Sequence, residues 1–337
     1  MFSTIKINKS IINPSMLILG PCSVESKDQF FETALELKKL CRPDYIRGGV
    51  WKPRTRPGSF EGLGEQALEW MTEFRSIHNV PIAIEVATKE QVKLALEYNV
   101  DLLWIGARTT VNPFSVQEIA NELNGTEKPI FIKNPINADL SLWIGAVERI
   151  EKAGVKNIGL IHRGFNVIGN TLYRNPPMWH LALEMKNKFK NYKFICDPSH
   201  IGGRSELIFD ISQNALNLDY DGLMIESHRD PKNAWSDAQQ QLTPLELKEV
   251  LDELDFEIYE KIDNQTNVLN NTNLSQLSLI DNELVYLILK RKEIIDVIKN
   301  DNIELNLNSQ NLKILKRLED AKIISIDFIN HLKLMLK

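Results

Sequence analysis

The sequence predicts an α/β protein: a (β/α)8 TIM barrel followed by a small all-α helical domain. Eight short apolar runs occur between residues 16 and 228, and segments of helix length separate them. The runs are continuously apolar, as strands of a parallel sheet buried on both faces require. Nearly every run ends in a residue capable of chemistry, and a barrel of this kind keeps its active site at the C-terminal ends of its strands.

The expected strands carry charged, thiol or imidazole side chains at or just after their ends. In a parallel barrel these ends meet at one mouth, so we expect the side chains to face a common site. In chain order the runs are MLILG before Cys22, YIRGG with Arg47, IAIEVA with Glu85, LLWIGA before Arg108, IFIKN with Lys133, IGLIHRG with His162 and Arg163, FICDPSH with Asp197 and His200, and GLMIESH with Glu226 and His228.

Four of the segments between the runs show apolar residues at three- and four-residue spacing, which predicts helices. Several of these segments have Ser, Thr or Asp near their start, suited to an N-cap, and Gly154 suits a C-cap. The predicted helices span residues 26–40, 65–78, 88–98 and 141–154.

The pattern changes near residue 250 and divides the chain into predicted parts. Residues 1–250 form the barrel domain, and residues 242–263 are expected to form a helix running out of it. Residues 251–276 contain this helix extension and an Asn-rich linker, and from residue 277 to 337 the periodicity is purely helical. Because so small a module cannot bury its apolar faces well alone, we expect it to dimerise or to dock on the barrel.

The composition limits the class of partner. The chain has 337 residues, of which 43% are apolar and 25% charged, as in a soluble globular protein. A net charge of −5 gives no reason to expect binding to nucleic acid or a membrane surface. Three cysteines argue against a disulfide framework and favour a reducing cytoplasm. We therefore expect small-molecule substrates, no nucleic-acid or membrane partner, and a cytoplasmic homo-oligomer, either a dimer or a tetramer.

Four residues are candidate metal ligands: Cys22, His200, Glu226 and Asp237. They follow the first, seventh and eighth expected strands, which become neighbours when the barrel closes. A mixed set of sulfur, nitrogen and oxygen donors suits a divalent transition metal (Mn²⁺, Fe²⁺, Co²⁺ or Zn²⁺) rather than Ca²⁺. The alternative is that the cysteine is a small buried apolar residue and the carboxylates are solvated.

Five cations follow the other strands: Arg47, Lys52, Arg108, Lys133 and Arg163. Placed together in one barrel mouth they would repel one another unless an anion joined them. Guanidinium groups bind phosphate and carboxylate bidentately, and lysine acts as a point charge. The expected ligand therefore carries at least two anionic groups, although these side chains could instead extend from the rim into solvent.

Other residues leave more than one interpretation open. Pro53, Arg54 and Thr55, in the loop 51–62, offer donors for another phosphate or belong to an ordinary basic loop. His162, Asp197 and His228 could support the ligands, relay protons, or be satisfied structural residues. Glu85 has no firm role.

Several motifs together resemble those of 3-deoxy-D-arabino-heptulosonate 7-phosphate (DAHP) synthases, in the branch similar to 3-deoxy-D-manno-octulosonate 8-phosphate (KDO8P) synthases. The resemblance covers roughly residues 15–245. The motifs, in the family's order, are GPCSVES (20–26), RGGVWKPRT (47–55), IGART (105–109), FIKNP (131–135), IHRGF (161–165), DPSHIGGR (197–204), MIESH (224–228) and SDAQQQL (236–242).

The resemblance implies a condensation of phosphoenolpyruvate with erythrose 4-phosphate, the first step of the shikimate pathway to the aromatic amino acids. The residues that would hold the divalent metal are Cys22, His200, Glu226 and Asp237. Those that would contact phosphoenolpyruvate are Arg47, Lys52, Arg108, Lys133 and Arg163. The erythrose 4-phosphate site would be lined by Lys52, Pro53, Arg54 and Thr55.

The resemblance also implies catalytic roles. The metal would polarise the aldehyde oxygen as a Lewis acid. Lys52 would donate a proton to the new hydroxyl, directly or through water, and His228 or Asp237 would manage the attacking water. The residues expected to take part in catalysis are Lys52, Cys22, His200 and Asp237.

The KPRT segment (52–55) bears on the choice of aldose. KDO8P synthases resemble this chain elsewhere but carry a KANRS-type segment at this place, for a longer sugar phosphate. The resemblance therefore favours the four-carbon aldose. A KDO8P synthase that uses arabinose 5-phosphate stays as the alternative.

The tail is similar to the AroQ-type chorismate mutase helical domain, which some members of this family carry at the C-terminus. Residues 280–291 resemble the core of its long first helix, and Arg291 falls where that domain has a substrate-binding arginine. The other cations of that pocket are replaced, and the mutase transition state is stabilised chiefly by positioned cations. We therefore expect residues 277–337 to be a degenerate module with a structural, dimerising or regulatory role. A bifunctional enzyme with active mutase is the alternative.

Overall fold

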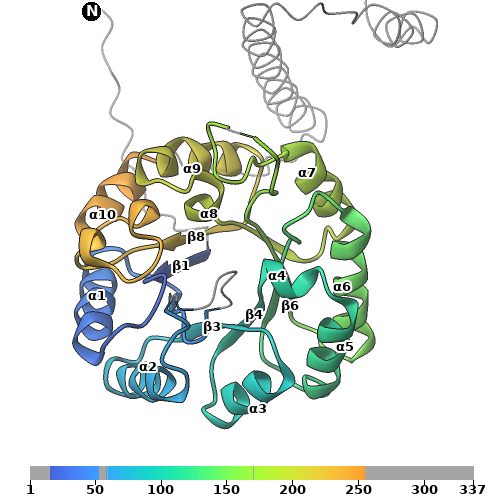
Figure 1. Ribbon diagram of the computed structural model, residues 1–337, viewed down its shortest axis with the longest axis horizontal. Helices are drawn as coiled ribbons and strands as arrows, with labels where there is room; N and C mark the ends of the chain where they lie inside the picture. Colours follow the sequence, from blue (N-terminus) through green and yellow to red (C-terminus); the bar gives the residue numbers. More distant parts are fainter. Residues whose placement is uncertain (1–15, 53–57, 59, 170, 255–337) are drawn as a thin grey trace, which may run out of the picture. The chain divides into compact units, whose positions relative to one another are not determined.

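A closed parallel barrel forms the centre of the molecule. The computed structural model describes residues 16–52, 58, 60–169 and 171–254. Within them eight strands follow one another around the ring in chain order, and β1 pairs with β8 to close it. Helices surround the ring, and the short helices α4 and α8 lie inward of the outer layer (Figure 1). The predicted (β/α)8 barrel is confirmed.

The strands coincide closely with the predicted apolar runs. Each observed strand lies within its run or extends it by one residue, because continuous Ile, Leu, Val and Phe suit a sheet covered on both faces. The strands are β1 (Met16–Gly20), β2 (Tyr45–Arg47), β3 (Ile82–Val86), β4 (Leu102–Ile105), β5 (Ile130–Lys133), β6 (Ile158–His162), β7 (Lys193–Cys196) and β8 (Gly222–Glu226).

Several outer helices begin at a capping residue of the type that the sequence predicted. The side chains of Ser26, Thr88 and Asp139 each accept a backbone N–H at the start of α1, α3 and α6. The helices are α1 (Lys27–Leu40), α2 (Glu65–His78), α3 (Lys89–Glu97), α4 (Ala107–Thr110), α5 (Pro113–Glu122), α6 (Leu140–Lys152), α7 (Trp179–Lys188), α8 (Pro198–Gly202), α9 (Ile208–Asn217) and α10 (Pro244–Glu253).

The final described helix differs from the prediction. We expected a helix over residues 242–263, whereas α10 begins after a capping box at Thr243 and ends at Glu253. The helix does not continue at Leu254, because the backbone there is extended and the side chain is buried, at 3% exposed. The remainder of the predicted linker (251–276) and the predicted helical module (277–337) lie outside the described residues. No described helix is long and apolar enough to cross a membrane.

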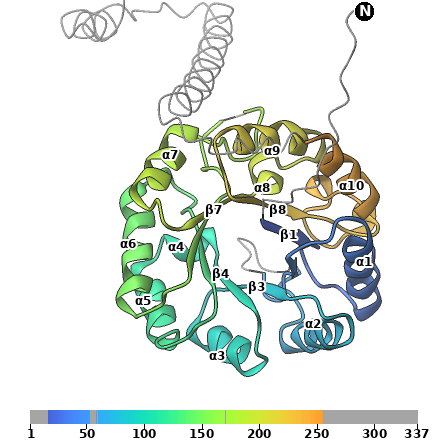
Figure 2. The same cartoon turned by 180° about the vertical axis from the view of Figure 1, so that it is seen from behind.

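Apolar side chains from seven of the eight strands fill the barrel interior, with the partly buried Tyr45 of β2 packed against them. Side chains two positions apart on a strand point to the same face. The residue two positions after an interior side chain therefore lies above the core, at the C-terminal mouth. Figure 2 shows the ring of strands and helices from the opposite side. The interior cluster comprises Ile18, Ala83, Leu102, Trp104, Phe131, Ile161, Ile195 and Met224.

Candidate active site

A layer of polar side chains lies directly above this core. Glu85 follows Ala83 by two residues, Lys133 follows Phe131 and Glu226 follows Met224. The same two-residue spacing places further residues at the mouth. The residues beside them in sequence are apolar or face outward. The resulting layer contains Arg47, Glu85, Lys133, Arg163, Asp197 and Glu226.

Cys22 and Asp237 lie together beyond the ends of β1 and β8. The Cys22 Sγ is 3.3 Å from the Asp237 Oδ2, and the Lys52 Nζ donates to the same sulfur at 2.9 Å. Asp237 adopts a left-handed backbone conformation with φ of 45°, which aspartate tolerates better than most residues. Both candidate ligands are therefore held close to the predicted proton donor.

His200 lies on α8, which begins one residue after β7. Asp197 caps this helix by accepting the backbone N–H of His200 at 3.1 Å. The same carboxylate lies 2.9 Å from the His200 Nδ1 and leaves Nε2 directed at Glu226, 3.9 Å from its Oε1. Asp197 thus fixes the orientation of the imidazole, a role that the sequence left open.

Glu226 is fully buried at the end of β8. Its Oε2 accepts a hydrogen bond from the Gln240 side chain at 2.5 Å. Its Oε1 lies 3.0 Å from the Arg47 guanidinium but has no hydrogen-bond partner in the described structure. One carboxylate oxygen is therefore tied to the surrounding loop, and the other faces the centre of the site.

The four candidate metal ligands form two adjacent pairs. Cys22 contacts Asp237, and His200 faces Glu226. Among the described residues, no three Cys, His, Asp or Glu side chains already form a group able to hold a metal ion. We call Cys22, His200, Glu226 and Asp237 the donor cluster.

The charges of the site shift several pKa values. Burial, followed by the negative charge of Glu226, raises the pKa of the Cys22 thiol to about 12. Burial also lowers the pKa of His200, although Asp197 opposes that shift. For Asp237, burial raises the pKa, but the charges of His200, Arg174 and Lys52 outweigh it and hold the pKa below its usual range. The lowered pKa keeps the Asp237 carboxylate ionised at neutral pH.

Two cations pair across the mouth with acidic residues. The Lys133 Nζ is 2.7 Å from the Asp197 Oδ2, and Arg47 pairs with Glu226. The indole ring of Trp104, a buried residue of β4, lies beneath both cations, at 5.2 Å from the Arg47 Cζ and 5.6 Å from the Lys133 Nζ. Trp104 also donates its Nε1–H to Glu85 at 2.9 Å.

Two further cations complete this side of the mouth. Arg163 is 8% exposed, and burial lowers the pKa of its guanidinium to about 10, with Arg174 and Arg108 adding positive charge that lowers it further. Arg108 is exposed on α4. We call Arg47, Arg108, Lys133 and Arg163 the cation cluster. These four residues lie at or after the ends of strands β2, β4, β5 and β6, whereas Lys52 contacts Cys22 of the donor cluster.

Some predicted site residues lie elsewhere or outside the described structure. His162 faces outward from β6, where Tyr220 and the carbonyl of Pro177 bind its two ring nitrogens at 2.9 and 2.7 Å. His228 lies 3.4 Å from Glu25 and contacts the backbone of Asp230, which gives it a local partner. The expected aldose-binding residues Pro53, Arg54 and Thr55 lie outside the described residues.

Three residues of the site had no assigned role in the sequence: Trp104, Arg174 and Gln240. Trp104 lies two residues after Leu102 and so faces the same side of β4, a signal that could have placed it inside the barrel, beneath the mouth. Gln240 belongs to the SDAQQQL motif but was not distinguished from its neighbours. Arg174 lies in the loop after β6, where no periodicity marks it.

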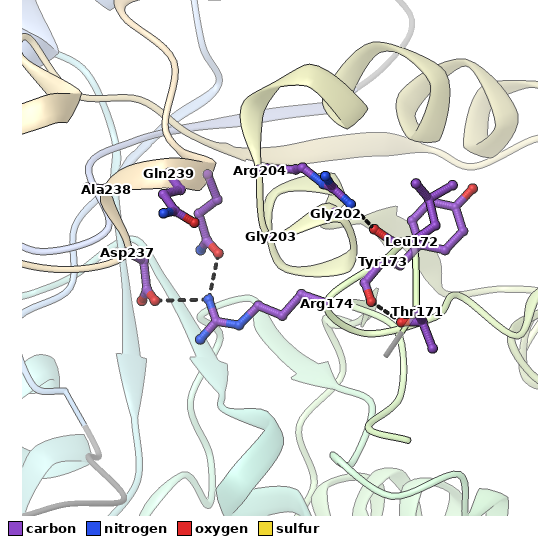
Figure 3. Close-up of a pocket in the computed structure, with 11 residues that line it drawn as sticks. Thr171, Leu172, Tyr173, Arg174, Gly202, Gly203, Arg204, Asp237, Ala238 and Gln239 are labelled. Carbon is purple, nitrogen blue, oxygen red and sulfur yellow. Dashed lines mark hydrogen bonds and ion pairs between the residues drawn. The ribbon is translucent and has the colours of Figure 1, made fainter. Parts of the chain in front are cut away.

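A cavity of about 520 Å³ opens beside the donor cluster. The β6–α7 loop, the residues after α8 and the loop after β8 line it, and Arg174 extends across it towards Asp237 (Figure 3). The lining includes Thr171, Arg174, Gly203, Arg204, Asp237 and Gln240.

This geometry defines the class of protein. A cluster of cations facing sulfur, imidazole and carboxylate donors, at the C-terminal mouth of a (β/α)8 barrel, is the arrangement of a barrel enzyme that acts on anionic substrates. The DAHP synthetase I family model matches residues 5–260. The chain therefore belongs to the DAHP synthetase I family.

Individual relatives agree with this assignment. The chain is 32% identical over 238 residues to a phospho-2-dehydro-3-deoxyheptonate aldolase of Thermotoga maritima, covering 71% of this chain and 68% of that one. A crystal structure of DAHP synthase from Thermotoga maritima matches with a TM-score of 0.64 and 30% identity, covering 73% and 71% of the two chains. A 2-dehydro-3-deoxyphosphooctonate aldolase of Rhizobium meliloti is 27% identical over 254 residues, covering 71% and 88%.

Proposed function

We propose that this enzyme condenses phosphoenolpyruvate with erythrose 4-phosphate to give DAHP and inorganic phosphate, as the first step of the shikimate pathway. The observation that carries the proposal is the pair of clusters at one barrel mouth. Arg47 and Lys133 are 2% and 3% exposed and lie over one indole ring, where a small dianionic or trianionic substrate would neutralise them. The donor cluster lies directly beside them.

The donor cluster also fits a divalent metal ion, which we propose as the cofactor (Mn²⁺, Fe²⁺, Co²⁺ or Zn²⁺). The buried Oε1 of Glu226 makes no hydrogen bond in the described structure beyond its ion pair with Arg47, so it can still accept a cation, and a buried acceptor without hydrogen bonds is costly. Thiol, imidazole and carboxylate donors are together typical of borderline dications. Bound there by Cys22, His200, Glu226 and Asp237, the metal would supply Lewis-acid polarisation of the aldehyde oxygen.

The residues of the chain position the reactants. The cation cluster binds the carboxylate and phosphate of phosphoenolpyruvate and directs its C3 towards the aldehyde carbon, which is a proximity effect. The new C–C bond forms as C3 attacks that carbon, and positive character develops at C2. Water then adds at C2, the C–O bond to phosphate breaks, and phosphate leaves with that oxygen.

Lys52 is the proposed proton donor. Its Nζ is 3.0 Å from the carbonyl oxygen of Cys22 and 2.9 Å from the Cys22 sulfur, so it is held where the aldehyde oxygen would meet the donor cluster. Protonation of that oxygen gives the new hydroxyl. His228 contacts Glu25, which favours Asp237 over His228 for handling the attacking water.

The alternative is KDO8P synthesis from arabinose 5-phosphate. Several relatives of 27–28% identity carry the name 2-dehydro-3-deoxyphosphooctonate aldolase. The KPRT segment favours the four-carbon aldose, and a direct comparison of the two aldoses distinguishes the two activities.

The decisive experiment measures phosphate release from phosphoenolpyruvate with each aldose, with and without a chelator. We expect release with erythrose 4-phosphate, little with arabinose 5-phosphate, and loss of turnover after chelation with recovery on adding a divalent metal. Preference for arabinose 5-phosphate would establish the alternative. Unchanged turnover in metal-stripped buffer would overturn the proposed cofactor.

For the tail (277–337) we propose a degenerate chorismate mutase-like module with a structural, dimerising or regulatory role. The family match ends at residue 260 and so does not include it. The test is purified protein with chorismate, for which we expect no prephenate formation above the uncatalysed rate. An ordinary enzymatic rate would instead establish a bifunctional enzyme. The predicted homo-oligomer, a dimer or a tetramer, would be tested by sedimentation of the same protein.

A further inference from the structure

Arg174 connects two carboxylates of the donor cluster. Its NH1 group donates to the Asp237 Oδ1 at 2.9 Å and to the Gln240 Oε1 at 2.8 Å (Figure 3). The amide nitrogen of Gln240 then donates to the Glu226 Oε2 at 2.5 Å. One guanidinium therefore holds one ligand directly and a second through a single side chain.

The two carboxylates are held in the same way. In Asp237, Oδ1 binds Arg174 while Oδ2 faces Cys22. In Glu226, Oε2 binds Gln240 while Oε1 faces His200 and Arg47. Each carboxylate thus has one oxygen bound from the cavity side and one directed to the centre of the donor cluster, so the outer contacts help to set the orientation of both groups.

The backbone around Arg174 supports the third ligand. Its N–H donates to the Gly202 carbonyl at 3.2 Å, and the side-chain amide of the next residue, Asn175, donates to the His200 carbonyl at 2.7 Å. Gly203, with φ of +70°, leaves room for the arginine stem, because a Cβ there would lie 2.4 Å from the Arg174 Cβ. The loop, the helix α8 and the arginine therefore fit as one unit.

The contribution of this contact to stability is small. The Arg174 side chain is 48% exposed and that of Asp237 is 19% exposed, and ion pairs so open to solvent stabilise a fold little. The orientation that this ion pair gives to Asp237 matters more than its contribution to stability, because groups that orient metal ligands affect metal affinity about 10- to 100-fold. We propose that Arg174 is a positioning residue, which aligns Asp237 and, through Gln240, Glu226 for binding the divalent cation. This inference rests on the proposed function.

The test compares Arg174→Gln with the control Arg204→Gln in the full chain. Arg204 lines the same cavity but donates to the Leu172 carbonyl. We expect Arg174→Gln to weaken Co²⁺ binding about 10-fold or more and to change the visible absorption of bound Co²⁺. The control should bind Co²⁺ as the wild type does, and Arg174→Lys should recover part of the affinity. Both glutamine variants should melt within about 3 °C of the wild type, since little stability is lost.

Kinetics supply the second measurement. Arg174→Gln should lower kcat while the KM for phosphoenolpyruvate stays within about twofold, because the cation cluster is untouched. Equal Co²⁺ affinity and spectrum in the two glutamine variants would overturn the inference. A wild type that binds Co²⁺ but releases no phosphate from phosphoenolpyruvate would overturn the proposed function and leave the binding comparison valid. A wild type that binds no Co²⁺ but releases phosphate would overturn the inference and the proposed cofactor, and leave the proposed reaction standing.

Discussion

The cation cluster and the donor cluster lie side by side at one barrel mouth, yet they are built differently. Arg47 and Lys133 lie on the strands themselves, and ladder hydrogen bonds fix their backbone. Cys22, His200 and Asp237 lie beyond the strand ends, where hydrogen bonds from other loops orient them. The sheet fixes the backbone of these two cations, whereas these three donors depend on hydrogen bonds from residues outside the strands.

The largest expected effect comes from breaking the ion pair that joins the two sides. Lys133→Met leaves the buried Asp197 without its lysine, which should lower the free energy of unfolding by about 3–5 kcal/mol and abolish turnover. Urea unfolding measures the stability. The matched control is Lys27→Met, whose ion pair with Glu73 is about half exposed and should contribute less than about 1 kcal/mol. Equal losses in the two variants would contradict the prediction.

A change in the donor cluster should separate activity from stability. Cys22→Ser removes the sulfur donor at nearly constant volume, so we expect kcat/KM to fall about 1000-fold. The free energy of unfolding should change by less than about 1 kcal/mol, because the buried serine hydroxyl can keep the contacts of the sulfur with Asp237 and Lys52. Turnover and urea unfolding on the same preparation test both statements, and retained activity would remove Cys22 from the donor cluster.

The outward-facing His162 should affect stability and leave catalysis unchanged. Burial lowers the pKa of His162 to about 4, so its folded pKa lies below the unfolded value of about 6.5. The stabilisation that the neutral His162 gives to the folded state is complete above pH 6.5 and is lost as the pH falls. The free energy of unfolding should therefore decrease by about 2 kcal/mol between pH 7.5 and pH 5. Denaturant unfolding at the two pH values measures this loss, which should be smaller in His162→Gln. A fall in kcat/KM at neutral pH would contradict the outward assignment.

The smallest expected effect concerns the ring beneath the cation cluster. Trp104→Phe keeps an aromatic face but removes the N–H bond to Glu85, and should raise the KM for phosphoenolpyruvate about fivefold. Trp143→Phe is the control, because this buried tryptophan of α6 also donates its Nε1–H, here to the Ile132 carbonyl, but lies outside the barrel. It should change stability and leave the KM unaltered. Equal KM changes in both variants would exclude a positioning role for Trp104.

The sequence predicted the structure best in the strands, whose positions follow from the apolar runs. The apolar runs predicted all eight strands, and neighbouring strands one, seven and eight correctly brought the candidate ligands near one another. The alternation of side chains between the two faces of a strand was a signal that the prediction did not use. Arg163 and His162 are adjacent, so they cannot both face the mouth, and the same argument assigns Glu85 and Trp104 to the interior.

The residues that sequence reasoning missed act through loop conformation. Arg174 meets Asp237 across 63 residues, and Gln240 meets Glu226 because the intervening loop folds back on the strand end. Neither contact leaves a periodic signal, since each depends on turns such as the left-handed backbone of Asp237 and Gly203. The strands could be predicted, and the supporting contacts required the structure.

The pairing of the first strand with the last also determines when the site can exist during folding. Cys22 meets Lys52 early in the chain, but its amide binds Gln241, 219 residues later, and β1 gains its second neighbour only from β8. Contacts between such distant segments form late, because the entropy of closing the intervening chain opposes them. A ribosome-bound chain that has not yet emerged as far as Glu226 therefore lacks half of its donors, Glu226 and Asp237, and the site is complete only when the ring closes.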